Sequence, residues 1–173
     1  MTRTRLISIA IVSAWLAVTL CMWFVATRSF RNVGRVLASP SGEFEQTVET
    51  LGHDRARAAL RYLASEFNRS MFHTYGLAQI ALGALLLILV WRATPRDSTA
   101  LGLSGAMLAL ALVLTFIIQP QIVTLGRAID FLPRNPPPPQ VSRFWMLHGA
   151  FTGLDGVKLL AGLYLLVRWM ARG

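Results

Sequence analysis

The sequence is poor in cysteine and in charged residues, and each shortage excludes a class of protein. Cys21 is the only cysteine, so the chain has no intrachain disulfide and no thiolate metal cluster. Charged residues make up 14% of the chain, whereas ordinary soluble domains carry about 25%. Hydrophobic residues make up 54% and are gathered in unbroken runs. This composition excludes an ordinary soluble domain and indicates a protein solvated by lipid.

Motifs for catalysis and phosphate binding are also missing. The glycines Gly102 and Gly105 lie at the start of an apolar run and lack the Lys and Ser/Thr of a phosphate loop. Ser13, Ser104 and Thr115 have no His and acid arranged with them for nucleophilic catalysis. The sequence therefore predicts no catalytic residue and no cofactor, and it favours a non-enzymatic protein.

The charge that is present is mainly arginine. The formal net charge is +9, and Lys158 is the only lysine. The arginines flank the apolar runs and do not form a patch interleaved with exposed aromatics. We therefore expect anionic lipid head groups as their partners and exclude nucleic acid.

Four apolar runs are long enough to cross a bilayer. At about 1.5 Å per residue, roughly 20 helical residues span a hydrocarbon core of about 30 Å. The predicted crossings are residues 6–26, 72–91, 100–118 and 144–169. We predict an all-α polytopic membrane protein, a single integral domain over 1–173, with four transmembrane helices and amphipathic interfacial helices in its loops. A signal peptide is the alternative for the first run, which follows Arg3 and Arg5, but the run is long for one.

The segments between the crossings predict further helices. In the interfacial loop 27–71, apolar residues at helical spacing extend the first helix, form a short helix near Phe44, and lead directly into the second crossing. Asp54 is the expected N-cap before that crossing, and Asp97 or Ser98 the expected cap of the third. Pro120 is expected to end or kink the third run before another short surface helix, and residues 133–139 form a stiff Pro-rich connector.

An even number of crossings places both termini on one face of the membrane. Six arginines fall on that face: Arg3, Arg5, Arg92, Arg96, Arg168 and Arg172. The larger number on the other face favours a cytoplasmic position for the first and third loops. The termini are therefore expected to be extracytoplasmic.

Two charged residues lie near the middle of the fourth crossing. Asp155 and Lys158 are three residues apart, so they share a helix face and can neutralise each other. An ionisable group at this depth costs about 2.5–3.5 kcal/mol, so both should point into the bundle. They either form a proton, ion or ligand site, or an ion pair that fixes helix register, and we favour the second interpretation.

Polar residues and glycines recur at helical spacing beside Asp155 and Lys158. His148, Thr152 and Asp155 follow one another at i, i+4 and i+7. Helix-packing glycines lie beside them: Gly149, Gly153 and Gly156. Polar candidates to face them from other crossings are Gln79, Thr115 and Gln119. We predict a close helix contact here, with a hydrogen-bonded network that joins Gln79, Gln119, His148 and Asp155.

Two histidines open crossings at the same predicted membrane face. His73 and His148 could form a bis-imidazole haem or metal pair. No carboxylate or thiol at ligand spacing joins them, so we favour interfacial hydrogen bonding and predict no metal site.

Three groups of residues carry a family resemblance. They are Trp23 to Ala26 with Phe30, then Glu66, Asn68, Arg69 and Phe72 before the second crossing, and Arg143-Phe144 through Leu147-His148-Gly149. On these residues the chain resembles the DUF4149 or transmembrane-protein-205-like family of four-helix membrane proteins. The resemblance implies a bacterial inner-membrane protein and no particular activity.

These observations leave three hypotheses in order. The first is a non-enzymatic accessory or structural membrane component that acts through helix packing, in a homo-oligomer or a larger membrane complex. The second is a small oligomeric carrier that uses Asp155, Lys158 and Gln79. The third is a haem-binding or redox membrane protein.

Overall fold

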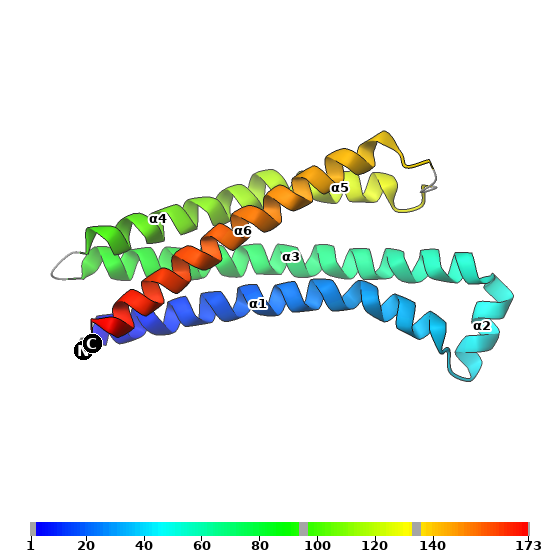
Figure 1. Ribbon diagram of the computed structural model, residues 1–173, viewed down its shortest axis with the longest axis horizontal. Coiled ribbons are helices and arrows are strands. Elements are labelled where there is room, and N and C mark those ends of the chain that lie inside the picture. The colour runs from blue at the N-terminus through cyan, green and yellow to red at the C-terminus, as the bar shows by residue number, and fades with distance from the viewer. Residues whose placement is uncertain (1–2, 94–96, 133–135, 173) are drawn as a thin grey trace.

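The computed structural model describes residues 3–93, 97–132 and 136–172, and every regular element in this part of the chain is a helix. The elements are α1 (Arg3–Ala38), α2 (Glu43–Leu51), α3 (His53–Arg92), α4 (Ser98–Val113), the π-helix η1 (Leu114–Ile118), α5 (Gln119–Ile129) and α6 (Pro139–Ala171) (Figure 1).

Four helical stretches are long and apolar enough to cross a membrane. They are Arg3–Ala38, His53–Arg92, Ser98–Ile129 and Pro139–Ala171. In the most apolar window of each, between 28% and 33% of the residues are buried in the bundle, so most of these side chains face outward, as lipid contact requires. The prediction of an all-α protein with four membrane-spanning helices is confirmed, and each predicted crossing falls within one of these stretches.

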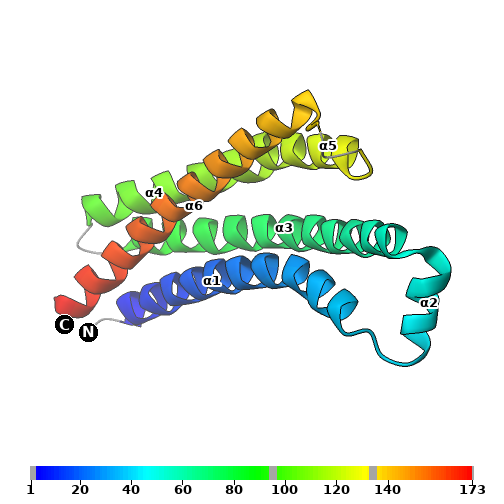
Figure 2. The ribbon, with the colours of Figure 1, turned by 45° about the vertical axis from the view of Figure 1, so that its right-hand side comes forward.

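The bundle is closed at one end and splayed at the other. Helix α3 packs between α1 and α4, while α6 contacts α1 and α4 as well as α5. Figures 1 and 2 show α6 close to the start of α1 at the end that holds both termini. Toward α2, α6 turns away from α1 and runs beside α5. Two pairs of helices, α1 with α3 and α5 with α6, therefore face each other across the splayed end.

Two glycines turn the chain on either side of α2. Gly42 has φ of 49° and Gly52 has φ of 80°, a region that glycine enters without steric cost. Val48 of α2 is buried with Leu37 and Ala56, which attaches the short helix to the ends of α1 and α3. The prediction that Asp54 caps α3 was wrong: the helix begins at His53, and Gly52 occupies the N-cap position.

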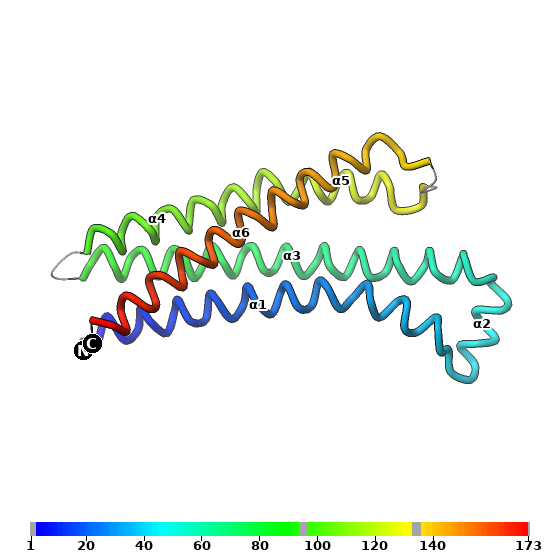
Figure 3. The backbone as a smooth tube through the Cα atoms, viewed as in Figure 1, coloured from blue at the N-terminus to red at the C-terminus, as the bar shows by residue number. Residues whose placement is uncertain are grey.

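Pro120 does not end the third crossing. Figure 3 shows a continuous tube from α4 into α5. The π-helical turn accommodates the proline, since the Gln119 N–H donates to the Leu114 carbonyl five residues earlier. Pro120 follows directly in the first turn of α5, and the helix continues past it with one backbone hydrogen bond fewer, because proline has no N–H to donate. The short surface helix expected after the proline is thus the continuation of the membrane helix.

The predicted Pro-rich connector, residues 133–139, falls only in part within the described residues. Of residues 133–139, 133–135 lie outside the described residues, and Pro139 is already the first residue of α6. Proline is favoured at this position because its fixed φ suits the first turn of a helix.

Candidate functional site

A buried ion pair occupies the centre of the bundle. The Lys158 Nζ lies 2.7 Å from the Asp155 Oδ1, and the two side chains are 2% and 0% exposed. Both project from α6, three residues apart, toward α1 and α3. Each charge is therefore removed from lipid and compensated by the other, which offsets part of the cost of burying it.

Two aromatic side chains donate hydrogen bonds to the Asp155 carboxylate. The Tyr75 hydroxyl from α3 donates to Asp155, 2.7 Å from Oδ1 and 2.9 Å from Oδ2. The Trp23 indole from α1 donates to Oδ2 at 2.8 Å. Asp155 thus holds three helices together through charge-assisted hydrogen bonds, which are stronger than neutral ones.

The lysine lies against aromatic rings as well as against its counter-ion. Its Nζ is 3.4 Å from the Tyr75 hydroxyl oxygen, 5.3 Å from the centre of the Tyr75 ring and 6.0 Å from that of Trp15. Both ring distances lie within about 6 Å, the range in which a cation is attracted to a ring face.

The polar cluster continues to Gln79. The Thr19 Oγ1 lies 3.3 Å from the Tyr75 hydroxyl and accepts a hydrogen bond of 3.3 Å from the Gln79 Nε2. Thr19 itself donates to the Trp15 carbonyl. We call the set Trp15, Thr19, Trp23, Tyr75, Gln79, Asp155 and Lys158 the central cluster.

An apolar layer covers the central cluster on the side of the splayed end. Phe72 and Phe151 meet edge to face with ring centres 5.5 Å apart, and they pack with Met22 and Leu114 around the ring of Tyr75. The ion pair is consequently separated by side chains from the cavity described next.

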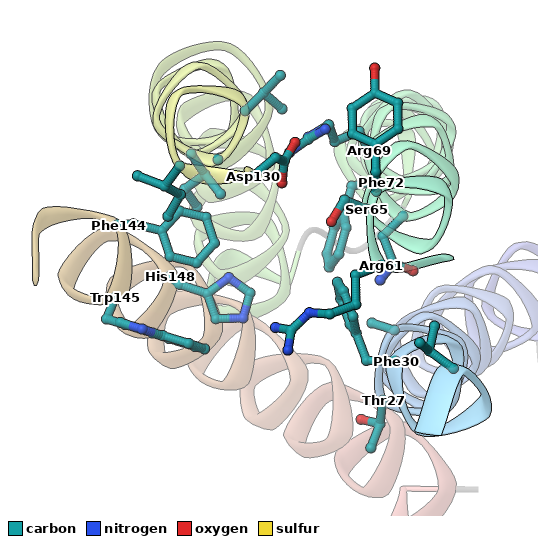
Figure 4. Close-up of a pocket in the computed structure, with 18 of the residues that line it drawn as sticks. Thr27, Phe30, Arg61, Ser65, Arg69, Phe72, Asp130, Phe144, Trp145 and His148 are labelled. Atoms are coloured by element: carbon teal, nitrogen blue, oxygen red, sulfur yellow. The ribbon is translucent and has the colours of Figure 1, made fainter. Parts of the chain in front are cut away.

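A cavity of about 670 Å³ lies between the two helix pairs at the splayed end. Figure 4 shows its wall, with Phe30 and Thr27 from α1, Arg61, Ser65, Arg69 and Phe72 from α3, and Phe144, Trp145 and His148 from α6. The side chains of Arg61 and His148 point toward each other across it. This volume falls within the roughly 300–1,000 Å³ of small-molecule sites.

An ion-pair network closes one wall of the cavity. Arg69 of α3 pairs with Glu66 at 2.5 Å and with Asp130, just after α5, at 2.7 Å. Arg127 of α5 reaches the same Glu66 at 3.2 Å. These contacts, which we call the α3–α5 clamp, join the two helices beyond their apolar segments.

A second clamp joins the helices at the end that holds the termini. Asp97 caps α4 by accepting from the Ala100 N–H, as predicted, and pairs with Arg168 at 3.0 Å and Arg172 at 3.3 Å. Partial burial raises the pKa of Asp97, but the Ala100 N–H and Arg168 lower it by more, so the net pKa is below its ordinary value. Arg5 of α1 donates to the Trp169 carbonyl in the same region.

The predicted site residues divide between four places. Gln79, Asp155 and Lys158 meet in the central cluster. Gln119 and His148 line the large cavity instead, so the expected direct network of four residues is not formed. Thr115 packs on Gly76 at the junction of α3 and η1. Thr152 is exposed on the outside of α6, and its hydroxyl donates to the His148 carbonyl.

The close helix contacts occur at other glycines than those expected. A Cβ at Gly149 or Gly153 would meet nothing within 4 Å, and one at Gly156 would lie 4.0 Å from Trp23. A Cβ at Gly76 would lie 2.6 Å from the Thr115 hydroxyl, and one at Gly83 2.6 Å from the Trp15 ring. Close packing inside the chain is therefore provided by Gly76 and Gly83 of α3 and by Gly162 of α6, where a Cβ would lie 3.0 Å from the Leu16 side chain, and not by Gly149, Gly153 or Gly156.

The two histidines do not share a site. His148 lines the large cavity, while His73 is exposed and lines a separate depression between α3 and α5. Within the described residues, no group of three or more His, Cys, Asp or Glu side chains could hold a metal ion.

Four members of the central cluster were not predicted: Trp15, Thr19, Trp23 and Tyr75. Their spacing contains a usable signal, since Trp15, Thr19 and Trp23 recur every four residues on α1, and Tyr75 precedes Gln79 by four on α3. Each is an aromatic or hydroxyl side chain with a polar atom that needs a partner in lipid.

A comparison with known protein families finds a match to part of the chain. A family model described as "Domain of unknown function (DUF4149)" matches residues 56–129, which covers most of α3 and all of α4, η1 and α5. The resemblance to DUF4149 is confirmed over this segment. No curated protein and no solved structure matches the chain.

Proposed function

We propose that this multi-pass membrane protein is a non-enzymatic membrane component that acts through helix packing. One observation carries the proposal: the charges at bilayer depth are paired with each other and held by Tyr75 and Trp23. A carboxylate that shuttles a proton or an ion needs a path to water. Phe72 and Phe151 stand between Asp155 and the large cavity at the splayed end. The pair is thus suited to fixing the register of α6 against α1 and α3.

The outer face of α6 is the surface we assign to a partner helix. Gly149 and Gly153 are exposed, with open space beyond their Cα atoms, and glycines four residues apart permit close approach of a second membrane helix. The partner is a second copy of the chain or a helix of a larger membrane complex.

The substitution Gly153→Ile tests this role without disturbing the fold, because a side chain there points away from the bundle. We expect it to abolish self-association or co-purification in mild detergent. Gly102→Ile is the matched control, since Gly102 is also helical, exposed and free of neighbours within 4 Å. Equal association of both variants and the parent would refute the packing role of α6.

Carrier activity is the competing function, because an intramembrane Asp and Lys recur in ion-coupled proteins. It predicts pH-dependent flux in liposomes that Asp155→Asn abolishes. A flux of that kind would replace our proposal. A Soret band in the purified protein would instead support the haem-binding hypothesis.

We further propose a bacterial inner-membrane location with extracytoplasmic termini and with anionic head groups around the arginines. The larger number of arginines in the first and third loops supports this orientation. A reporter fused after Gly173 that is active only in the cytoplasm would overturn it.

A further inference from the structure

The large cavity lies at the edge of the membrane and extends beyond it. Its floor is formed by Phe72, where the second apolar run begins, and by Phe151, seven residues into the fourth run. Arg57 lines it fifteen positions before Phe72 on α3, which is about 22 Å along the helix. The cavity thus connects the level of the lipid tails with the level of the head groups and above.

The wall of the cavity is aromatic and accessible from outside. Phe30, Phe144 and Trp145 contribute to it, with Tyr62 on the α3 side. Phe30 is 43% exposed and Trp145 is 60% exposed, so these rings offer apolar surface to a molecule that enters between α1 and α6. An acyl chain is the apolar molecule that the surrounding bilayer supplies.

The charge in the cavity is positive and partly uncompensated. Six charged or titratable side chains line it: Arg57, Arg61, Tyr62, Arg69, Asp130 and His148. Arg69 and Asp130 pair with each other. Among the described residues, Arg57 and Arg61 make no hydrogen bond or ion pair.

Two separate arginines therefore line one cavity without a counter-ion. The guanidinium group of Arg61 extends into the space toward the His148 ring (Figure 4). A guanidinium binds phosphate oxygens in a bidentate geometry that an ammonium group does not offer.

We propose that this cavity binds one anionic phospholipid of the surrounding bilayer. The phosphate lies between Arg61 and His148, with Arg57 adding positive charge above it. The acyl part runs along Phe30, Phe144 and Trp145 toward the floor at Phe72. Charge complementarity selects an anionic over a zwitterionic lipid, and the aromatic wall distinguishes a lipid from a free anion.

The test uses the full chain, purified in mild detergent and mixed with phosphatidylglycerol or phosphatidylcholine. Bound lipid per chain is counted by native mass spectrometry. We expect one phosphatidylglycerol to be retained in preference to phosphatidylcholine. The double substitution Arg57→Gln and Arg61→Gln should weaken retention by about tenfold or more, because each arginine near an anionic head group contributes roughly one tenfold step or slightly less.

The matched control is Arg31→Gln with Arg55→Gln, which changes the net charge equally at the same end of the bundle but outside the cavity wall. It should retain the lipid. Equal loss in both double variants would show diffuse surface attraction and overturn the proposal, as would equal retention of the two lipids.

Two further measurements separate the apolar from the anionic part of the site. Gly34 lines the cavity, and a Cβ there meets nothing within 4 Å, so Gly34→Leu occupies space without a clash and should reduce retention with both arginines intact. Inorganic phosphate at high concentration should not displace the lipid. Complete displacement, or full retention by Gly34→Leu, would assign the arginines to a free anion and refute a lipid site.

Discussion

The central ion pair makes a quantitative prediction about coupling between Asp155 and Lys158. Lys158→Met removes the cation and leaves the Asp155 carboxylate, which is 0% exposed, with only the Tyr75 and Trp23 donors. Breaking a buried pair in this way costs about 3–5 kcal/mol of unfolding free energy. Asp155→Asn should cost a similar amount, because it leaves the Lys158 ammonium buried without its counter-ion.

The double variant Asp155→Asn with Lys158→Met should be more stable than the sum of the single effects implies. No uncompensated charge remains in it, and the Asn carbonyl still accepts a hydrogen bond from Tyr75 or Trp23. We expect a recovery of at least about 2 kcal/mol relative to additivity, in the range found for residues in direct contact.

The assay is unfolding of the detergent-solubilised protein by increasing mole fraction of sodium dodecyl sulfate, followed by circular dichroism. Thr152→Val is the control on the same helix, since Thr152 is exposed and outside the central cluster, and it should change the unfolding free energy by less than about 0.5 kcal/mol. If the single effects of Asp155→Asn and Lys158→Met add to within about 0.5 kcal/mol, the two residues are not a coupled unit and the register role is refuted.

Two other predictions concern the clamp at the termini and the close contact of α3. Asp97 has a lowered pKa, so its stabilising effect is complete above the ordinary carboxyl pKa and is lost as pH falls through the folded-state value. Asp97→Asn should therefore lower the melting temperature at about pH 7, and by less once the pH falls below the ordinary carboxyl pKa of about 3.9, whereas a constant difference would contradict the clamp. Gly76→Ala should destabilise the protein by about 1–3 kcal/mol, because the new methyl group would lie 2.6 Å from the Thr115 hydroxyl. Gly149→Ala, which meets open space, should leave the melting temperature unchanged.

The long helices could be predicted because a helix that crosses a membrane needs about 20 consecutive, mostly apolar residues. Residues 6–26 and 72–91 are predominantly apolar runs without Asp, Glu, Lys or Arg, and no soluble alternative buries such runs. The charged pair on α6 was predictable for the same reason, since its cost in lipid requires that it point inward.

Which residues would meet that pair could not be predicted as easily. Tyr75 and Trp23 contact Asp155 because α3 and α1 present particular faces to α6, and rotation about each helix axis is decided by packing between helices. The helix was expected to end or kink at Pro120 because proline disrupts an α-helix locally. The π-helical turn η1, which precedes the proline, lets the helix continue, and the sequence rule for proline does not include such a turn. The cavity arises from the divergence of α6 from α1, a property of the whole bundle that no single segment encodes.

The two clamps also give the protein a preferred membrane thickness. One joins α3 to α5 at Glu66, Arg69 and Asp130, and the other joins α4 to α6 at Asp97 and Arg168. From Arg69 in the first clamp to Arg92, which lies five residues before Asp97 of the second clamp, α3 rises about 35 Å. A bilayer much thicker than its usual core of about 30 Å would draw the clamps into hydrocarbon, and a thinner one would expose apolar rings to water. The ion pairs that hold the helices together therefore also favour membranes whose hydrocarbon thickness matches the distance between the two clamps.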